Sequence, residues 1–277
     1  MKNKFNMCDA KRLHDAINNS VKQFADNGLE NYILLSGGAD SLCVLYAVIE
    51  LGLPYKVINF KFEGKDSIDT DSVRFLWDKI KFPVEWLELP INNIDVLRQS
   101  VCLSKQIFGR IRKVKVETIY AMLLVREKIP KGVNILSGFG GDGAVCYHKN
   151  DAILISKVGQ EAEEVLKIRR GNKNNDEFRH IFSDWNYFTP YHEKEVTDVL
   201  IDYTTTACNA RFPKSAFVYA YADSFRKYEN YRRPIGFHKA SHEVDAFEEL
   251  AKQNGFNSAL SFFNAIGKEL ENVRIKG

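Results

Sequence analysis

The sequence is poor in cysteine, and its five cysteines include no Cys-x-x-Cys pair. That spacing is typical of structural zinc sites and of many redox or sulfur-transfer centres, so the sequence does not favour these classes. The odd number also argues against a disulfide framework. No apolar run approaches the roughly 20 residues that a membrane-spanning helix needs. We therefore expect no membrane association and a reduced, cytoplasmic compartment.

A strong charge of either sign is also absent. The 277 residues carry a formal net charge of +3, with 45% hydrophobic and 27% charged residues. This composition is ordinary for a globular protein, and the charge is too small to indicate nucleic-acid binding by itself. The length allows one large domain or two modest ones, with a core that needs neither metals nor disulfides.

The commonest phosphate-binding pattern, G-x-x-x-x-G-K-S/T, is missing, and the chain instead contains Ser36-Gly37-Gly38-Ala39-Asp40-Ser41. The apolar run before this segment predicts a buried strand at 33–35, and the run after it predicts a helix over 40–51. A glycine turn between strand and helix points backbone N–H groups at one place, where the helix dipole also favours an anion. An ordinary Gly-rich turn without a ligand is the simpler alternative.

The rest of the chain predicts an α/β fold, with a parallel sheet of about five strands and helices on both faces. We expect the strands at 33–35, 55–62, 84–89 and 133–136, with a short one at 152–156. From about residue 159 the apolar spacing is helical, and the polar stretch 167–176 predicts a loop. We expect one domain, with an α/β core over 1–158 and a helical region over 159–277.

A second glycine-rich loop, Ser137-Gly-Phe-Gly-Gly-Asp142, follows the strand predicted at 133–136. Ligands of open α/β sheets bind beyond the carboxyl ends of the strands, so both glycine-rich loops are expected at one edge. Asp40 and Asp142 would then lie together and supply the oxygen ligands that Mg²⁺ prefers. Each aspartate has a simpler interpretation as a helix cap or a turn residue.

Both loops resemble those of the asparagine synthetase-like N-type ATP pyrophosphatases, also called the PP-loop superfamily. The first loop is similar to Ser-Gly-Gly-x-Asp-Ser and the second, from Leu136, to Leu-Ser-Gly-x-Gly-x-Asp. Weaker similarities over residues 10–250 lie at 59–64, 117–120, 212–214 and 231–237. The resemblance implies the adenine nucleotide alpha hydrolase-like (HUP-type) fold. It also implies an enzyme that cuts ATP between its α and β phosphates.

The resemblance further implies ATP and Mg²⁺ as cofactors, with Asp40 and Asp142 as the metal ligands. It implies an AMP-forming ligase that adenylates an acceptor oxygen of a carboxylate or an amide, releases pyrophosphate and forms a C–N bond. Residues implied for the nucleotide are Leu34, Ser36, Gly37, Gly38, Asp40, Ser41, Phe60, Lys115 and Gly138. Residues implied for catalysis are Lys214, Lys239 and Arg233.

Two positions depart from the family pattern. Phe139 stands where amide-forming members carry an acid or a tyrosine, and Pro234 or Ile235 stands where they carry a lysine. The glutaminase half of the family is also absent, so we expect a stand-alone synthetase domain. Its nitrogen source would be ammonia, an amine substrate or a separate glutaminase partner, and its acceptor a small molecule.

Two alternatives remain open from the sequence. The first is a PP-loop enzyme that modifies a base of tRNA or DNA, for which the basic segments 110–115 and 167–173 would bind phosphates. Solvated surface charge is the commoner explanation of such segments, so nucleic acid is not the favoured partner. The second alternative is a module that binds ATP or AMP without turnover.

Overall fold

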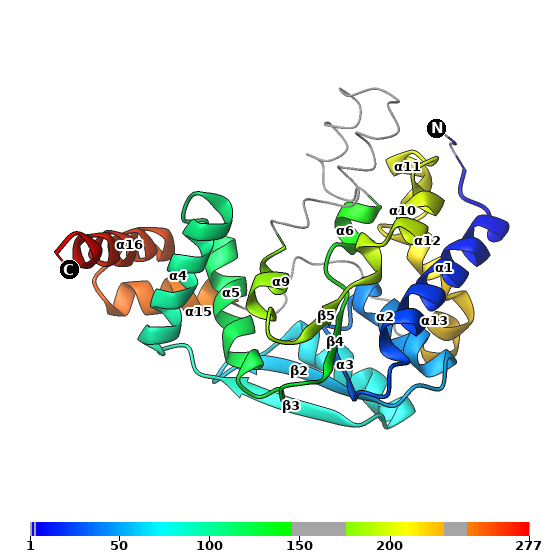
Figure 1. Ribbon diagram of the computed structural model, residues 1–277, viewed down its shortest axis with the longest axis horizontal. Helices are drawn as coiled ribbons and strands as arrows, with labels where there is room; N and C mark the ends of the chain where they lie inside the picture. Colours follow the sequence, from blue (N-terminus) through cyan, green and yellow to red (C-terminus); the bar gives the residue numbers. More distant parts are fainter. Residues whose placement is uncertain (1, 3, 146–175, 230–242, 277) are drawn as a thin grey trace.

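The computed structural model describes residues 2, 4–145, 176–229 and 243–276. Its centre is a five-stranded, fully parallel sheet with the strand order β3-β2-β1-β4-β5 (Figure 1). The strands are β1 Asn31–Leu34, β2 Tyr55–Phe62, β3 Val84–Leu89, β4 Asn134–Ser137 and β5 Asn186–Phe188. The predicted α/β fold with about five parallel strands is therefore confirmed.

Helices cover both faces of the sheet and bury a separate apolar cluster on each face. One group comprises α1 Met7–Ala25, α2 Ala39–Glu50, α3 Ile68–Ile80, α10 Lys194–Leu200, α11 Thr205–Cys208, α12 Ser215–Ala220 and α13 Ala222–Tyr228. The other comprises α4 Ile94–Phe108, α5 Lys113–Arg126, α9 Glu177–Ile181, α15 Glu243–Gln253 and α16 Ala259–Lys276. Two short elements, α6 Gly141–Ala144 and η2 Pro190–His192, lie beyond the carboxyl ends of β4 and β5.

Helix α2 is central to the first face because α1 and α12 both pack on it. Nine of its 12 residues are buried, including the whole run Leu42–Val48. A helix that is apolar on all sides must be enclosed by other elements, as this one is. Helix α1 is instead amphipathic, and its start is stabilised by a capping box between Asn6 and Asp9.

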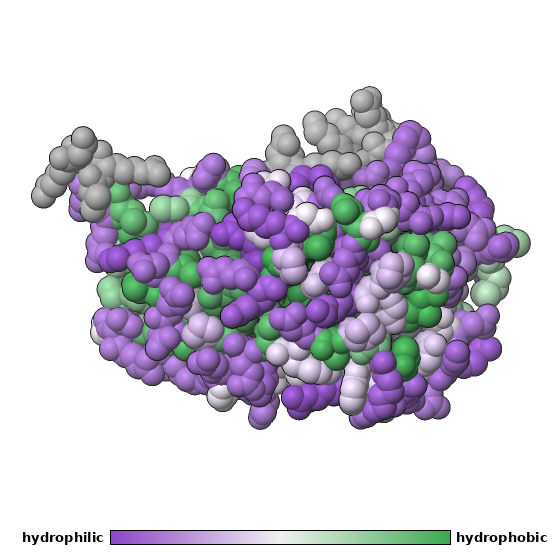
Figure 2. Space-filling model, turned by 60° about the horizontal axis from the view of Figure 1, so that its bottom comes forward, coloured by the Kyte–Doolittle hydropathy of each residue, from purple (hydrophilic) through white to green (hydrophobic). Residues whose placement is uncertain are grey.

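The surface turned forward in Figure 2 is polar, with apolar residues in small separate groups. Two large exposed aromatic side chains, Phe75 and Trp86, carry the cationic side chains of Lys79 and Arg74 over their rings. Such cation–π contacts shield part of each ring from water. In the described part of the chain, no helix is both long enough and apolar enough to cross a membrane.

The fifth strand comes from a part of the chain in which only helices were expected. β5 is three residues long and pairs with β4 through Asn134 and Asn186, at one edge of the sheet. Three residues are too few to show an alternating or continuous apolar pattern, so the sequence carried no signal for this strand. The strand expected at 152–156 lies outside the described residues, and so does the loop expected at 167–176 except for Asp176, which caps α9.

Helix α5 carries a buried carboxylate, that of Glu117, whose protonation is expected to make the stability of the protein depend on pH. Glu117 is 0% exposed, and neither of its carboxylate oxygens has a hydrogen-bond partner among the described residues. The ammonium of Lys113 lies 3.8 Å away but also pairs with Glu248. Burial raises the pKa of Glu117 from 4.5 to about 7, although the charge of Lys113 opposes the shift.

We expect Glu117→Gln to stabilise the protein above neutral pH and to have little effect at pH 5. A raised pKa means that the folded state holds its proton more tightly than the unfolded state. The stability that the protonated Glu117 contributes to the folded state is therefore complete below pH 4.5 and is lost as the pH rises through about 7. The difference is worth about 3 kcal/mol at most. Urea unfolding at pH 5 and pH 8.5 measures this difference in the free energy of unfolding. Glu127→Gln, at an exposed position, is the control. Parallel pH profiles of stability for the wild type and Glu117→Gln would contradict the prediction.

Candidate functional site

The strand order places a topological switch point between β1 and β4. The chain leaves β1 toward β2 on one side and leaves β4 toward β5 on the other, so the two connections diverge. Ligands of open parallel sheets bind in the crevice that this divergence leaves at the carboxyl ends of the strands. The two glycine-rich loops predicted from the sequence follow β1 and β4 directly, so both lie at this switch point.

The first loop, Ser36–Ser41, is held in shape by its own hydroxyl groups. The Ser41 hydroxyl accepts a hydrogen bond from the Ser36 N–H at 3.3 Å and donates to the Gly38 carbonyl at 3.1 Å. The Ser36 hydroxyl accepts from the Gly38 N–H at 3.3 Å. Gly38 is the N-cap of the 12-residue helix α2 and supplies no capping side chain. The start of a helix favours an anion, because its N–H groups and the helix dipole point there.

Glycine is required at position 37 for two reasons. Gly37 has a φ of +73°, which a side chain would strain, and an added Cβ would lie 2.6 Å from the Ser72 hydroxyl on α3. The loop therefore passes closely under α3 and turns back toward α2. This geometry suits an anion held by backbone N–H groups.

The second loop packs directly against the first. A Cβ on Gly138 would lie 2.5 Å from the Ser41 nitrogen, and a Cβ on Gly141 would lie 2.6 Å from the Asp40 carboxyl carbon. No side chain fits between the two loops at these positions. The loops thus form one unit in which a shift of either displaces the other.

A buried lysine connects the two loops. The Lys214 ammonium forms ion pairs with Asp40 and, at 2.6 Å, with Asp142. Burial by itself would lower the pKa of Lys214, but the charges of Asp40 and Asp142 outweigh it and raise the pKa above its usual value. The ammonium therefore stays charged between two carboxylates. The structure brings these three residues together, although Asp40 and Lys214 are 174 positions apart in the sequence.

Lys214 reaches this position through an unusual backbone conformation. Its φ is +62° and its ψ is 25°, in the left-handed region that residues with a Cβ rarely occupy. The Lys214 N–H donates a 2.6 Å hydrogen bond to the side chain of Asn209, and helix α12 begins at the next residue. A left-handed lysine costs on the order of 1–3 kcal/mol, and such strain clusters at functional sites.

The donor chemistry of Asp40 and Asp142 fits the expected Mg²⁺. Both are carboxylates, which are the hard oxygen ligands that Mg²⁺ takes in proteins, and they face a common point. Among the described residues, no group of three or more His, Cys, Asp or Glu side chains gathers to hold a metal ion. The remaining ligands would be phosphate oxygens and water, as is usual for Mg²⁺ with nucleotides.

The two apolar residues implied for the nucleotide lie on neighbouring strands of the sheet. Leu34 ends β1 and Phe60 lies in β2, and both are only partly buried against the apolar cluster of the second face. Gly138 lies against Ser41, as described above. Lys115 is farther along the site: it forms a 2.5 Å ion pair with Glu177, and its ammonium lies 5.7 Å from the centre of the Phe139 ring. Lys239 and Arg233 lie outside the described residues.

Phe139 is surrounded by groups that the sequence did not single out. Its ring stacks on Phe178 with 4.8 Å between centroids, and the buried ring of His192 lies edge-on at 6.2 Å. Nδ1 of His192 is 3.6 Å from the carboxylate of Asp176, which caps helix α9. Burial raises the pKa of Asp176 to about 6. Asp176 had a weak signal as a cap before an apolar helical pattern, whereas His192 had none.

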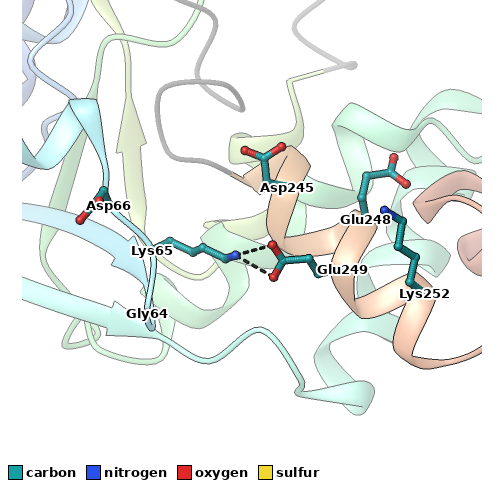
Figure 3. Close-up of a pocket in the computed structure, with 7 residues that line it drawn as sticks. All are labelled: Gly64, Lys65, Asp66, Asp245, Glu248, Glu249 and Lys252. Carbon is teal, nitrogen blue, oxygen red and sulfur yellow. Dashed lines mark hydrogen bonds and ion pairs between the residues drawn. The ribbon is translucent and has the colours of Figure 1, made fainter.

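A polar recess of about 450 Å³ lies beyond the carboxyl end of β2, at the same edge of the sheet (Figure 3). Lys65 extends across it from the β2–α3 connection to Glu249 of α15, making two contacts of 2.7 Å. The lining residues are Gly64, Lys65, Asp66, Asp245, Glu248, Glu249 and Lys252. Such a lining suits a polar or charged molecule better than an apolar one.

Comparisons with known proteins are distant. No family model matches the chain, and no curated protein sequence matches it significantly. Among solved structures, the chain is similar to U34-tRNA thiolase NcsA from Methanococcus maripaludis with its 4Fe-4S cluster. That match has a TM-score of 0.40 and 14% identity, and it covers 95% of this chain and 79% of the other. A second match is NMN synthetase from Francisella tularensis, with a TM-score of 0.35 and 12% identity over 90% of this chain and 95% of the other. Similarities this low do not assign an activity.

Proposed function

We propose that the chain is an ATP-using enzyme of the PP-loop pyrophosphatase type, which forms AMP and pyrophosphate while making a C–N bond. One observation carries the proposal: two glycine-rich loops meet at the switch point of a parallel sheet, with a buried lysine between their aspartates. The first loop has the geometry of a phosphate site, and the sequence of both loops resembles this superfamily.

In the proposed reaction, an oxygen of the acceptor attacks the α phosphorus of ATP. The bond between the α phosphorus and its bridging oxygen to the β phosphorus breaks, and pyrophosphate leaves. A nitrogen nucleophile then attacks the carbon that bears the adenylated oxygen. AMP departs with that oxygen, and the nitrogen loses a proton. Mg²⁺ held by Asp40 and Asp142 would neutralise charge that develops on the phosphate oxygens.

The residues of this chain would divide the work as follows. The N–H groups at the start of α2 would bind the leaving pyrophosphate, where the helix dipole favours negative charge. Lys214, which lies between both loops, would also contact the phosphates. Leu34 and Phe60 would flank the adenosine. Phe139 accepts no proton, so the proton from the nitrogen must pass to another group or to water.

The test is a product assay with ATP, Mg²⁺ and a panel of carboxylate and amide acceptors, with ammonia or amines as nucleophiles. We expect AMP and pyrophosphate in equal amounts, and both should depend on the acceptor. Release of ADP and phosphate would contradict the proposal. ATP binding without pyrophosphate release under all conditions would instead support a non-catalytic nucleotide-binding module.

The main alternative to a small-molecule ligase is a tRNA-modifying enzyme of the same superfamily. In the basic segment 110–115, Lys113 pairs with Glu248 and Lys115 with Glu177. These acidic partners reduce the charge that the segment offers to phosphates, which supports the small-molecule acceptor. Binding to tRNA that weakens steeply as salt rises, with pyrophosphate release stimulated by tRNA, would favour the modifying enzyme.

A further inference from the structure

Lys214 occupies the place between Asp40 and Asp142 that the proposed function reserves for Mg²⁺. Its ammonium lies 2.6 Å from one oxygen of Asp142 and contacts Asp40 at the same time. Mg²⁺ binds oxygen at about 2.0–2.1 Å. An ammonium group and a metal ion cannot both sit between the same two carboxylate oxygens. The two cations therefore compete for one position.

The position of Lys214 is fixed by its burial, its backbone conformation and the packing of the helix that follows it. The residue is 6% exposed, and its backbone is held in the left-handed region by the hydrogen bond to Asn209. Helix α12, which starts at Ser215, packs against both α1 and α2. The ammonium is thus delivered to the loops by a packed element, in contrast to an exposed lysine that samples many positions.

The charges decide which cation the pair prefers. Among the described residues, the two carboxylates and the ammonium of Lys214 sum to a net charge of −1, which gives a lone divalent cation little attraction while Lys214 remains. ATP changes this balance, because its triphosphate adds negative charge and further oxygen ligands. The ammonium can then move onto phosphate oxygens as the metal takes its place.

We propose that Lys214 is an internal counter-ion that excludes divalent cations from the Asp40–Asp142 pair until a nucleotide arrives. This inference rests on the proposed function for the identity of the metal ligands. It adds an order of binding: Mg²⁺ enters with ATP and does not bind first. It also explains why a lysine is held in a strained backbone conformation at this point.

The test measures Mn²⁺, a paramagnetic substitute for Mg²⁺, by electron paramagnetic resonance in the absence of nucleotide. We expect weak binding by the wild type and binding at least about tenfold tighter by Lys214→Met, because the competing charge is removed. Adding Asp142→Asn to Lys214→Met should abolish the gain. Lys214→Arg, which retains the charge, should bind as weakly as the wild type. The control is Lys194→Met, since Lys194 is exposed and its ammonium pairs with Asp198 one helical turn away.

Equal Mn²⁺ affinity in wild type and folded Lys214→Met would overturn the inference. The inference would also be overturned if the wild type bound Mn²⁺ tightly without nucleotide and Asp142→Asn removed that binding. This second result does not depend on the folding of any Lys214 variant. Circular dichroism establishes folding of each variant. The inference and the proposed function fail separately, because the first is judged by metal binding without ATP and the second by pyrophosphate release.

Discussion

Asp40→Asn is expected to reduce ATP-dependent pyrophosphate release by on the order of 10²-fold or more while leaving the fold intact. The substitution removes the negative charge that would bind the metal, but it preserves the shape of a side chain packed against Gly141. Lys214 keeps Asp142 as an ionic partner, so no buried charge is left without a counter-ion. Pyrophosphate release under saturating ATP and Mg²⁺ measures the first effect, and urea unfolding measures the second.

Asp198→Asn is the matched control for this substitution. Asp198 pairs with Lys194 one helical turn away on the surface of α10, and exposed pairs of this kind contribute little to stability. The control should keep wild-type turnover. Wild-type rates in Asp40→Asn would refute the metal assignment. Loss of folding in Asp40→Asn would show that the ion pair with Lys214 is mainly structural.

Gly138→Ala is expected to disrupt both the site and its stability, although it adds a single methyl group. The new Cβ would lie 2.5 Å from the Ser41 nitrogen and 2.8 Å from the Asp40 carbonyl carbon. Both are backbone atoms at the start of α2, so they cannot rotate away as a side chain would. We expect the loops to separate, at a cost of about 2–3 kcal/mol in the free energy of unfolding. The affinity for ATP should fall at least about tenfold, because the displaced N–H groups are those that hold the phosphates.

Gly267→Ala separates this loop effect from the general effect of adding a methyl group. Gly267 lies within helix α16, and its added Cβ would meet the terminal methyl of Ile111, which is flexible. Alanine is also the better helix former, so stability should be unchanged or slightly higher. If the ATP affinity of Gly138→Ala stays at the wild-type level, the two loops are not parts of one nucleotide site.

The central strands were predictable because their signal is local. Strands β1 and β4 are short and mainly apolar, and β2 and β3 are rich in aliphatic and aromatic residues with polar residues between them. Each ends close to a glycine, a proline or a polar residue, and the structure confirms all four near their expected bounds. Helix α2 was equally clear, since an apolar run follows a glycine turn. β5 was not predictable, because its three residues become a strand only by pairing with β4.

The loops of the site were predictable for a similar reason. Each is a contiguous glycine-rich segment whose position after a strand places it at the carboxyl edge. Lys214 was named from its sequence context, but its contacts with Asp40 and Asp142 follow from the packing of α12 on α2. The pair of Asp176 and His192 beside Phe139 was missed altogether. Asp176 caps α9 and His192 lies in η2, and no sequence motif links the two positions.

The amino-acid sequence by itself determined the four strands β1 to β4, the helix that follows the first loop, and the two glycine-rich loops. These features depend on near neighbours in the chain: apolar runs, glycine turns and helix starts. The tertiary structure alone decided the strand order, the fifth strand and the contact between the loops. It also decided that the cation between Asp40 and Asp142 is a lysine of the protein. Contacts of this kind arise from packing between distant segments, which no local pattern records.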